Sequence, residues 1–289
     1  MHALGRTMNK LGLIAGGGRL PVELARFCQR VGRPVFVARL KGFSGGGLES
    51  FDGADFGIGE LGKLIEAFRR SGVTSVCMAG VVTRPDFRTL VPDFRGLAAM
   101  PGLIAAASKG DDSLLRQLVG VFEKEGFRVE GASDIMNELL LQAGPLGQVR
   151  PTVEQMNDAA RALDVALAVG RLDVGQGAVV CDGLVLAVEA QEGTDAMLRR
   201  VAELAPEIRG SRTSPRGVLA KAPKPIQERR VDLPTIGVGT VEAVARAGLA
   251  GIAGVSGGLI VLERAAVTAA ADRLGVFIWG ASERGPDPQ

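Results

Sequence analysis

Histidine and tyrosine are almost missing from this chain of 289 residues, which has a single histidine, His2, and no tyrosine. His2 lies in residues 1–7, which look like an extension ahead of Met8. Without a histidine in the folded body, a Ser-His-Asp or Cys-His nucleophile system and a histidine-ligated zinc site are excluded. If the chain is an enzyme, its acid–base and metal chemistry falls to Asp, Glu, Lys and Cys. Carboxylates with a hard cation such as Mg²⁺ are then the natural set.

The cysteines, the charge balance and the apolar runs exclude further classes. Three isolated cysteines without a CxxC pair are typical of reduced core residues in a cytoplasmic protein. No apolar run reaches the ~18 residues of a membrane-spanning helix, and the start lacks the apolar core of a signal peptide. With 34 Lys+Arg against 32 Asp+Glu, the net charge of +2 lacks the basic footprint of a nucleic-acid binder.

Short apolar runs that alternate with helical patterns predict an α/β fold with two domains. Strand-like runs at residues 11–15, 34–40, 76–82 and 127–129 are separated by helical patterns. They predict an N-terminal Rossmann-like domain over residues 8–143, with a parallel sheet and flanking helices. Two prolines and two glycines make residues 144–151 the expected linker. A helix capped by Thr152, a hairpin turning at Asp182-Gly183 and further short elements predict a mixed α/β catalytic domain over residues 152–282.

The turn Gly16-Gly17-Gly18 follows the first strand and precedes a helix that is expected to begin at Pro21. This arrangement is typical of a phosphate site, because glycines let an anion approach the free N–H groups of a helix N-terminus. Gly17 and Gly18 are therefore candidate substrate contacts. A plain strand–helix turn is the alternative. NAD is not expected, because Pro21 replaces the third glycine of the dinucleotide fingerprint.

Acidic motifs mark three further turns. The stretch Lys109-Gly110-Asp111-Asp112 opens a helix, and its aspartates either cap that helix or lie near a phosphate or metal. The turns at residues 173–176 and 189–195 flank the hairpin, where ligand groups commonly lie at strand ends. Thr194 or Asp195 could instead cap the next helix. Candidate substrate contacts are Lys109, Gly110, Asp111, Gln176, Gly193 and Thr194, and candidate metal ligands are Glu189 and Asp195, with Glu192 and Asp112 as further acids.

The densest polar stretch spans residues 221–237, where two lysines, two arginines, a glutamine and an aspartate lie among three prolines. The prolines stiffen the backbone, and rigidly placed cations suit a pyrophosphate, whose hydrolysis depends on charge and orientation. Candidate substrate contacts here are Lys221, Lys224, Gln227 and Arg229. Asp232 is the candidate catalytic carboxylate and a candidate metal ligand. A structural aspartate that pairs with Arg229 or Arg230 is the alternative.

Taken in order, the motifs GGGRLP, SKGDDSLLR, DVGQ, VEAQEGTDAMLRR and KAPKPIQERRVDLPTIG resemble the LpxI-type UDP-2,3-diacylglucosamine pyrophosphatases of lipid A synthesis. The resemblance covers the chain from about Met8 to Gly280, although Glu228 stands where the family often has Asp. It implies Mg²⁺-dependent (or Mn²⁺-dependent) hydrolysis of UDP-2,3-diacylglucosamine to UMP and 2,3-diacylglucosamine 1-phosphate (lipid X). It also implies two domains with the ligand between them, and Asp232 as the essential carboxylate.

The same resemblance implies a cytoplasmic enzyme that is peripheral to the inner membrane, with no nucleic-acid partner. Monomer and homodimer stay open. The apolar segment at residues 94–107 is either an acyl-chain contact or an ordinary core helix. Two other functions remain alternatives, a Rossmann-type nucleotide-sugar oxidoreductase or epimerase and a non-catalytic lipid- or nucleotide-binding regulator. Hydrolysis of the UDP-lipid to UMP and a sugar 1-phosphate would distinguish the pyrophosphatase from both alternatives.

Overall fold

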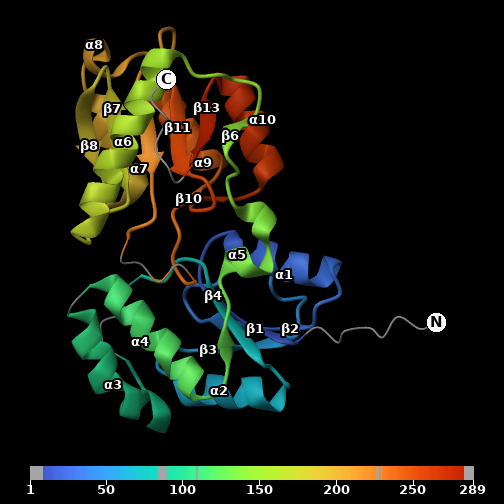
Figure 1. Ribbon diagram of the computed structural model, residues 1–289. Helices are drawn as coiled ribbons and strands as arrows, with labels where there is room; N and C mark the ends of the chain where they lie inside the picture. Colours follow the sequence, from blue (N-terminus) through green and yellow to red (C-terminus); the bar gives the residue numbers. More distant parts are fainter. Residues whose placement is uncertain (1–8, 84–89, 109, 226–227, 229, 283–289) are drawn as a thin grey trace. The chain divides into compact units, whose positions relative to one another are not determined.

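The computed structural model describes residues 9–83, 90–108, 110–225, 228 and 230–282 (Figure 1). The chain forms two compact units. The first unit runs to Asn137 and also contains Glu228–Asp232, whereas the second contains Glu138–Gln227 and the chain from Leu233 onward. The chain therefore passes between the units three times, once near residue 137 and once at each end of the five-residue segment Glu228–Asp232.

The first unit is built on a five-stranded parallel sheet with the order β3-β2-β1-β4-β5. Its strands are β1 (Leu11–Ala15), β2 (Val35–Leu40), β3 (Gly53–Phe56), β4 (Ser75–Ala79) and β5 (Arg128–Val129). Its helices are α1 (Leu20–Arg30), α2 (Leu61–Arg70), α3 (Phe94–Ala107), α4 (Asp111–Lys124) and α5 (Ala132–Ile135). A 3₁₀ turn, η1 (Asn137–Leu139), follows at the boundary.

Successive strand residues point to opposite faces of a sheet, and on one face of this sheet the side chains pack against α2 and α4. Ile14 and Val76 belong to the cluster that contains Phe68 of α2 and Phe122 of α4. A side chain could not replace Gly12, since an added Cβ would lie 2.8 Å from the Phe68 ring. Along the sheet, the order reverses between β1 and β4, and ligands of such folds commonly bind outside the carboxyl ends of strands at that point.

The second unit contains a six-stranded mixed sheet with the order β6-β13-β11-β9-β7-β8 and a small sheet of β10 and β12. Its strands are β6 (Gly144–Leu146), β7 (Gly177–Cys181), β8 (Leu184–Val188), β9 (Val218–Lys221), β10 (Thr235–Ile236), β11 (Gly251–Val255), β12 (Ile260–Val261) and β13 (Phe277–Ala281). Its helices are α6 (Val153–Arg171), α7 (Gly193–Glu203), α8 (Pro206–Arg209), α9 (Val238–Arg246) and α10 (Arg264–Leu274).

Helices cover both faces of the six-stranded sheet. Val179 and Leu219 pack in a cluster with residues of α7, α9 and α10, whereas their neighbours Ala178 and Ala220 pack against Ala162 and other residues of α6. The strands β9, β11 and β13 run parallel, and β7 runs antiparallel to β9. The end of β9, the start of β7 and the end of β8 therefore meet at one edge of the sheet.

The predicted α/β class with a Rossmann-like first half and a mixed second half is confirmed. Thr152 caps α6 with a capping box, and the hairpin of β7 and β8 turns at Asp182-Gly183 as expected. The linker expected at residues 144–151 is placed differently, because Gly144–Leu146 pairs with β13 as an edge strand of the second sheet. Proline tolerates an edge position, where its missing N–H is not needed. None of the described helices combines the length and apolar character that crossing a bilayer requires.

Candidate functional site

The glycine turn after β1 lies at the switch point of the first sheet, but part of its backbone is already paired. The amide of Gly17 donates to the carbonyl of Val81 at 2.8 Å, and the amide of Val81 donates back to Gly17 at 2.9 Å. The amide of Gly17 is therefore not available to a phosphate in this arrangement. Gly18 differs, since its φ is +88° and an added Cβ would meet no atom within 4 Å. The space beside Gly18, just before α1, is thus open.

The motif at the start of α4 serves to hold another segment. Its N-cap residue is Gly110, with a φ of 121°, and not an aspartate as the capping alternative would have it. Asp112 is buried, and its Oδ1 accepts a hydrogen bond of 2.7 Å from the backbone amide of Glu228. Its Oδ2 forms an ion pair with Arg116. Lys109 lies outside the described residues, as does the side chain of Asp111.

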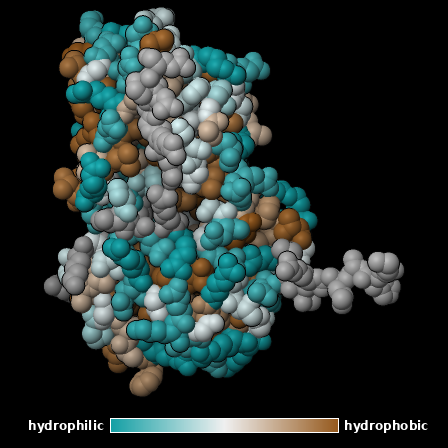
Figure 2. Space-filling model, in the orientation of Figure 1, coloured by the Kyte–Doolittle hydropathy of each residue, from teal (hydrophilic) through white to brown (hydrophobic). Residues whose placement is uncertain are grey.

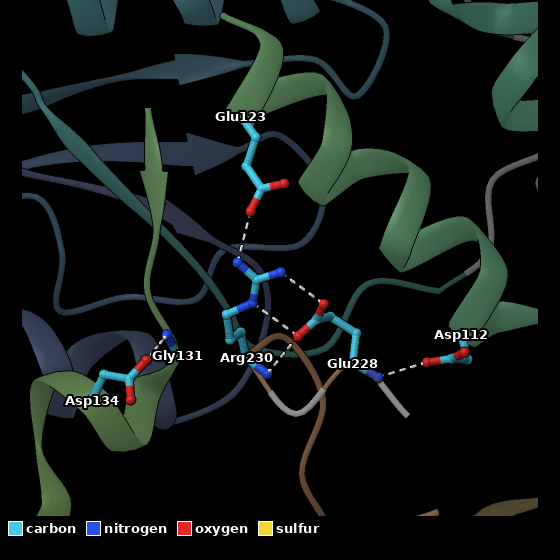
Figure 3. Close-up of polar contacts among 6 residues, drawn as sticks. All are labelled: Asp112, Glu123, Gly131, Asp134, Glu228 and Arg230. Atoms are coloured by element: carbon cyan, nitrogen blue, oxygen red, sulfur yellow. Dashed lines mark hydrogen bonds and ion pairs between the residues drawn. The ribbon is translucent and has the colours of Figure 1, made fainter. Parts of the chain in front are cut away.

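The segment Glu228–Asp232, which carries the candidate catalytic carboxylate, lies in the first unit (Figure 3). Arg230 forms a two-pronged pair with Glu228, with Nε–Oε1 at 2.9 Å and Nη2–Oε2 at 2.8 Å. Its Nη1 donates to Glu123 of α4 at 2.7 Å. The amides of Val231 and Asp232 both donate to the carbonyl of Glu228, at 3.0 and 3.2 Å. The segment is therefore a hydrogen-bonded turn, with half-buried Asp232 as its last residue.

Charge in this turn is balanced locally. The hydrogen bonds and charge of Arg230 hold the pKa of Glu228 below its usual value. Glu228 and then Glu123 raise the pKa of Arg230, so the guanidinium remains charged. Arg230 thus bonds to the carboxylates of Glu228 and Glu123, and the pairing of Asp232 with Arg229 or Arg230 stays an alternative. Gln227 and Arg229 fall outside the described residues.

A second polar cluster forms at the edge of the second sheet. Lys221 ends β9 with 5% of its surface exposed, and its ammonium donates to Thr194 Oγ1 at 2.7 Å and to the carbonyl of Thr235 at 3.3 Å. Thr194 in turn donates to Glu189 Oε1 at 2.7 Å. Glu189, which follows β8, is also only 5% exposed. One hydroxyl thus bridges a buried ammonium and a buried carboxylate from three different elements.

Two acceptor atoms of this edge lack hydrogen-bond partners among the described residues, Oε1 of Gln176 and Oε2 of Glu189. Leaving such a buried atom unpaired costs about 1–3 kcal/mol, which makes it a candidate contact for a ligand donor or a cation. Lys224 lies nearby in sequence and pairs with Asp173 at 2.7 Å. The motifs at residues 173–176 and 189–195 lie together, as expected from their positions on either side of the hairpin, and the structure adds residues 221–224 to them.

The start of α7 differs from the capping expectation. Its N-cap residue is Glu192, without a side-chain capping bond, and not Thr194 or Asp195. Glu192 pairs instead with Arg200 at 2.5 Å. Gly193 begins the helix with a φ of +77° and no atom near an added Cβ, while Asp195 lies exposed in the first turn. Thr194 is free to serve the cluster because the helix does not use it as a cap.

The three candidate metal ligands are divided between the units. Asp232 belongs to the first unit, and Glu189 and Asp195 belong to the second. Within the part of the chain that the structure describes, no three His, Cys, Asp or Glu side chains are grouped so that they could hold a metal ion. The carboxylate and amide oxygens present are nevertheless of the type that Mg²⁺ prefers.

Sequence reasoning missed three of the contacts that build these sites, those of Asp112 with Glu228, of Glu123 with Arg230 and of Asp173 with Lys224. The first two join residues 116 and 107 positions apart. No local spacing signals such a partner. The one available signal was the high density of charge at residues 221–232, which indicated partners without identifying them.

Both halves of the chain match known protein families. A model of the LpxI N-terminal domain matches residues 10–139, and a model of the LpxI C-terminal domain matches residues 142–279. A curated protein of Caulobacter vibrioides, named UDP-2,3-diacylglucosamine pyrophosphatase LpxI, is 61% identical over 282 residues, which cover 98% of this chain and 99% of that protein. A solved CobK precorrin-6A reductase covers 98% of this chain and 91% of its own at 14% identity, but its TM-score of 0.33 is too low to support an inference.

Proposed function

The chain belongs to the LpxI family, and from that premise we propose that it hydrolyses the pyrophosphate of UDP-2,3-diacylglucosamine, a step of lipid A biosynthesis. Water adds to one phosphorus and the P–O bond of the bridge breaks, which releases UMP and 2,3-diacylglucosamine 1-phosphate. The observation that carries this function is the near-complete match of both halves to a pyrophosphatase. It favours hydrolysis over the oxidoreductase and over the non-catalytic regulator.

Asp232 is the carboxylate that orients or deprotonates the attacking water. It is half-buried, and it closes a turn that is held by hydrogen bonds and ion pairs of the first unit. A carboxylate on such a turn suits both tasks, since a general base must lie within hydrogen-bond reach of the water. The stiff sequence Leu233-Pro234 that follows supports a defined position.

The cations of the second unit take different parts. Lys224 is the direct phosphate contact, because its ammonium lies at the strand-end edge of the second unit, where it pairs with Asp173. Lys221 acts through its neighbours, since its ammonium is buried and donates to Thr194 and Thr235. The orphan oxygens of Gln176 and Glu189 are suited to hydroxyl or N–H donors of the nucleotide. Lys109, Gln227 and Arg229 stay candidates on the sequence pattern.

Mg²⁺, or Mn²⁺ in its place, is the expected cofactor. Magnesium sites commonly combine one or two carboxylates with the phosphates of the substrate, so a protein cage of three carboxylates is not needed. Asp232 fits this donor set best. Glu189 fits less well, because Thr194 occupies its Oε1 and its Oε2 is buried close to Gly177. When bound, such an ion supplies positive charge to the phosphate oxygens as the bridge breaks.

A diacylated substrate has to be drawn from a membrane, and α3 offers an apolar surface for that contact. Phe94 is 88% exposed, Leu97 is 61% exposed and Ile104 is 46% exposed, and Val91 just before the helix is 85% exposed. Figure 2 shows hydrophobic residues at the lower left, where α3 lies in Figure 1. An apolar helix face without acidic residues suits a lipid surface better than water. This exposed apolar face supports the proposal that the enzyme works at the cytoplasmic face of the inner membrane.

A product assay tests the hydrolase function. The purified protein is incubated with UDP-2,3-diacylglucosamine in Mg²⁺, in Mn²⁺ and in EDTA, and the products are identified by mass spectrometry. We expect UMP and the acylated sugar 1-phosphate with either metal ion and no turnover in EDTA. Full turnover in EDTA would refute the metal requirement alone. An oxidised or epimerised UDP-sugar, or binding without turnover, would refute the hydrolase function.

Flotation with liposomes of neutral and anionic phospholipid tests the membrane contact. Replacing Phe94 and Leu97 together by serine should reduce the bound fraction several-fold while hydrolysis of detergent-dispersed substrate persists. Leu172 and Leu184, which are 76% and 63% exposed in the second unit, provide the matched control when both are changed to serine. Equal loss of binding in both double variants would refute a specific role for α3.

A further inference from the structure

The turn Glu228–Asp232 is a piece of the second half of the chain that the first unit has incorporated. The chain on either side of this turn belongs to the second unit. Holding this turn in one conformation has a cost, because ordering each backbone residue costs about 1–2 kcal/mol of conformational entropy. Contacts in the first unit must offset that cost.

Both ends of helix α4 make polar contacts with the turn. In its first turn, buried Asp112 accepts the amide of Glu228 at 2.7 Å. In its last turn, Glu123 accepts from Arg230 at 2.7 Å. The guanidinium of Arg230 also donates two hydrogen bonds to the carboxylate of Glu228, and this geometry fixes both the distance and the relative orientation of the two side chains. The helix thus holds the turn at Glu228 and at Arg230 (Figure 3).

Backbone and apolar contacts add to this attachment. An added Cβ at Gly131, just beyond β5, would lie 3.0 Å from Cα of Arg230, so the two backbones touch. Val231 packs against the cluster that includes Val119 and Phe122 of α4. The residue on each side of Val231 therefore has little freedom to shift, and one of these residues is Asp232.

We infer that α4 positions Asp232 for turnover through Glu123 and Arg230, an inference that rests on the catalytic role proposed for Asp232. Neither residue needs to contact the substrate. Their effect runs through the turn, because Glu228 carries the carbonyl that accepts the amide of Asp232 at 3.2 Å. A displacement of about 1 Å at a reacting group can lower a rate by about 10²-fold.

Kinetics of Glu123→Gln and Arg230→Lys test the inference. Each variant should lower kcat by about tenfold and change KM less than twofold, because the orientation of the base is affected while substrate binding is retained. The double variant should lose less than the product of the two single losses, since both residues act through one turn. Amide hydrogen exchange at Val231 and Asp232 should become faster in each variant.

Glu125→Gln is the matched control. Glu125 lies at the end of the same helix and also serves two arginines, Arg69 at 2.5 Å and Arg95 at 2.9 Å, but none of these pairs involves the turn. Its kcat should remain within twofold of the parent value. An equal kcat loss in Glu125→Gln would assign the effect to general stability and overturn the positioning role.

Asp232→Asn separates the two possible failures. If Asp232→Asn is inactive and Glu123→Gln retains full kcat, the positioning inference is wrong and the catalytic role stands. If Asp232→Asn retains full kcat, the catalytic role itself is wrong. A rise in KM at constant kcat in Arg230→Lys would show that Arg230 binds substrate, and would also overturn the positioning role.

Discussion

Replacing Lys221 by methionine should weaken the second unit substantially. The variant keeps the length of the side chain but loses the ammonium that donates to Thr194 at 2.7 Å and to the carbonyl of Thr235 at 3.3 Å. Glu189 is 5% exposed, and its carboxylate then keeps the hydrogen bond from Thr194. The Lys221 ammonium that donates to the same threonine is lost. The perturbation therefore leaves a buried charge without its compensating partner.

Breaking a buried ion pair by removing one partner typically costs about 3–5 kcal/mol. Because Thr194 stands between Lys221 and Glu189, we expect the lower end, about 3 kcal/mol. In a unit of this size that corresponds to a fall of about 6–12 °C in the melting temperature. The double variant Lys221→Met with Glu189→Gln should recover at least about 1 kcal/mol, since no carboxylate then remains to be compensated.

Urea unfolding followed by tryptophan fluorescence measures this loss selectively. Trp279 is the single tryptophan of the chain and lies in β13, so the signal reports on the second unit. Arg200→Met is the matched control, because its pair with Glu192 is solvent-exposed and should contribute little. A loss below about 1 kcal/mol in Lys221→Met, or no recovery in the double variant, would refute the bridged pair as a stabilising element.

Three further outcomes are expected. Asp232→Asn should lower kcat by about 10²–10⁴-fold with an unchanged melting temperature, whereas a lower melting temperature with weakened substrate binding would indicate a structural aspartate. Burial raises the pKa of Glu130, but the hydrogen bonds and charge of Arg33 outweigh it and the net pKa is lowered. The ion pair therefore stabilises the fold fully above the unfolded-state pKa of about 4.3, and this stabilisation is lost as the pH falls through the lower pKa of Glu130 in the folded state. Glu130→Gln should reduce this pH dependence in acid unfolding. Burial raises the pKa of the thiols of Cys28, Cys77 and Cys181. Iodoacetamide at pH 8 should therefore label the native protein hardly at all and the urea-unfolded protein fully. Rapid labelling of the native protein would contradict the buried positions of these cysteines.

The anchoring of Asp232 in the first unit changes how the long polar motif is understood. Residues 221–237 read in sequence as one rigid anion-binding stretch, but the structure divides them between the two units. Lys221 and Lys224 build the edge of the second sheet, and Glu228 and Arg230 build a turn on α4. The charges of this motif mainly satisfy one another and their neighbours, so the number of cations available to a pyrophosphate is smaller than composition indicated.

The sequence by itself determined the elements and the class of the fold. Alternating strand and helix periods predicted the parallel first sheet, and the cap at Thr152 and the turn at Asp182-Gly183 predicted the start of α6 and the hairpin. These features depend on residues within a few positions of one another, so local spacing specifies them. The short strand β3 was missed, because Gly53–Phe56 has neither an apolar run nor a clear alternation.

Only the tertiary structure decided which groups are free and which are engaged. The amide of Gly17 is paired with Val81 across the switch point, and the amide of Glu228 is paired with Asp112, 116 residues away. A side chain of a given type can bind a ligand or a distant segment equally well, and the choice depends on which surfaces burial brings together. The edge strand at Gly144–Leu146 shows the same limit, because a stretch typical of a linker becomes a strand when β13 offers it hydrogen bonds.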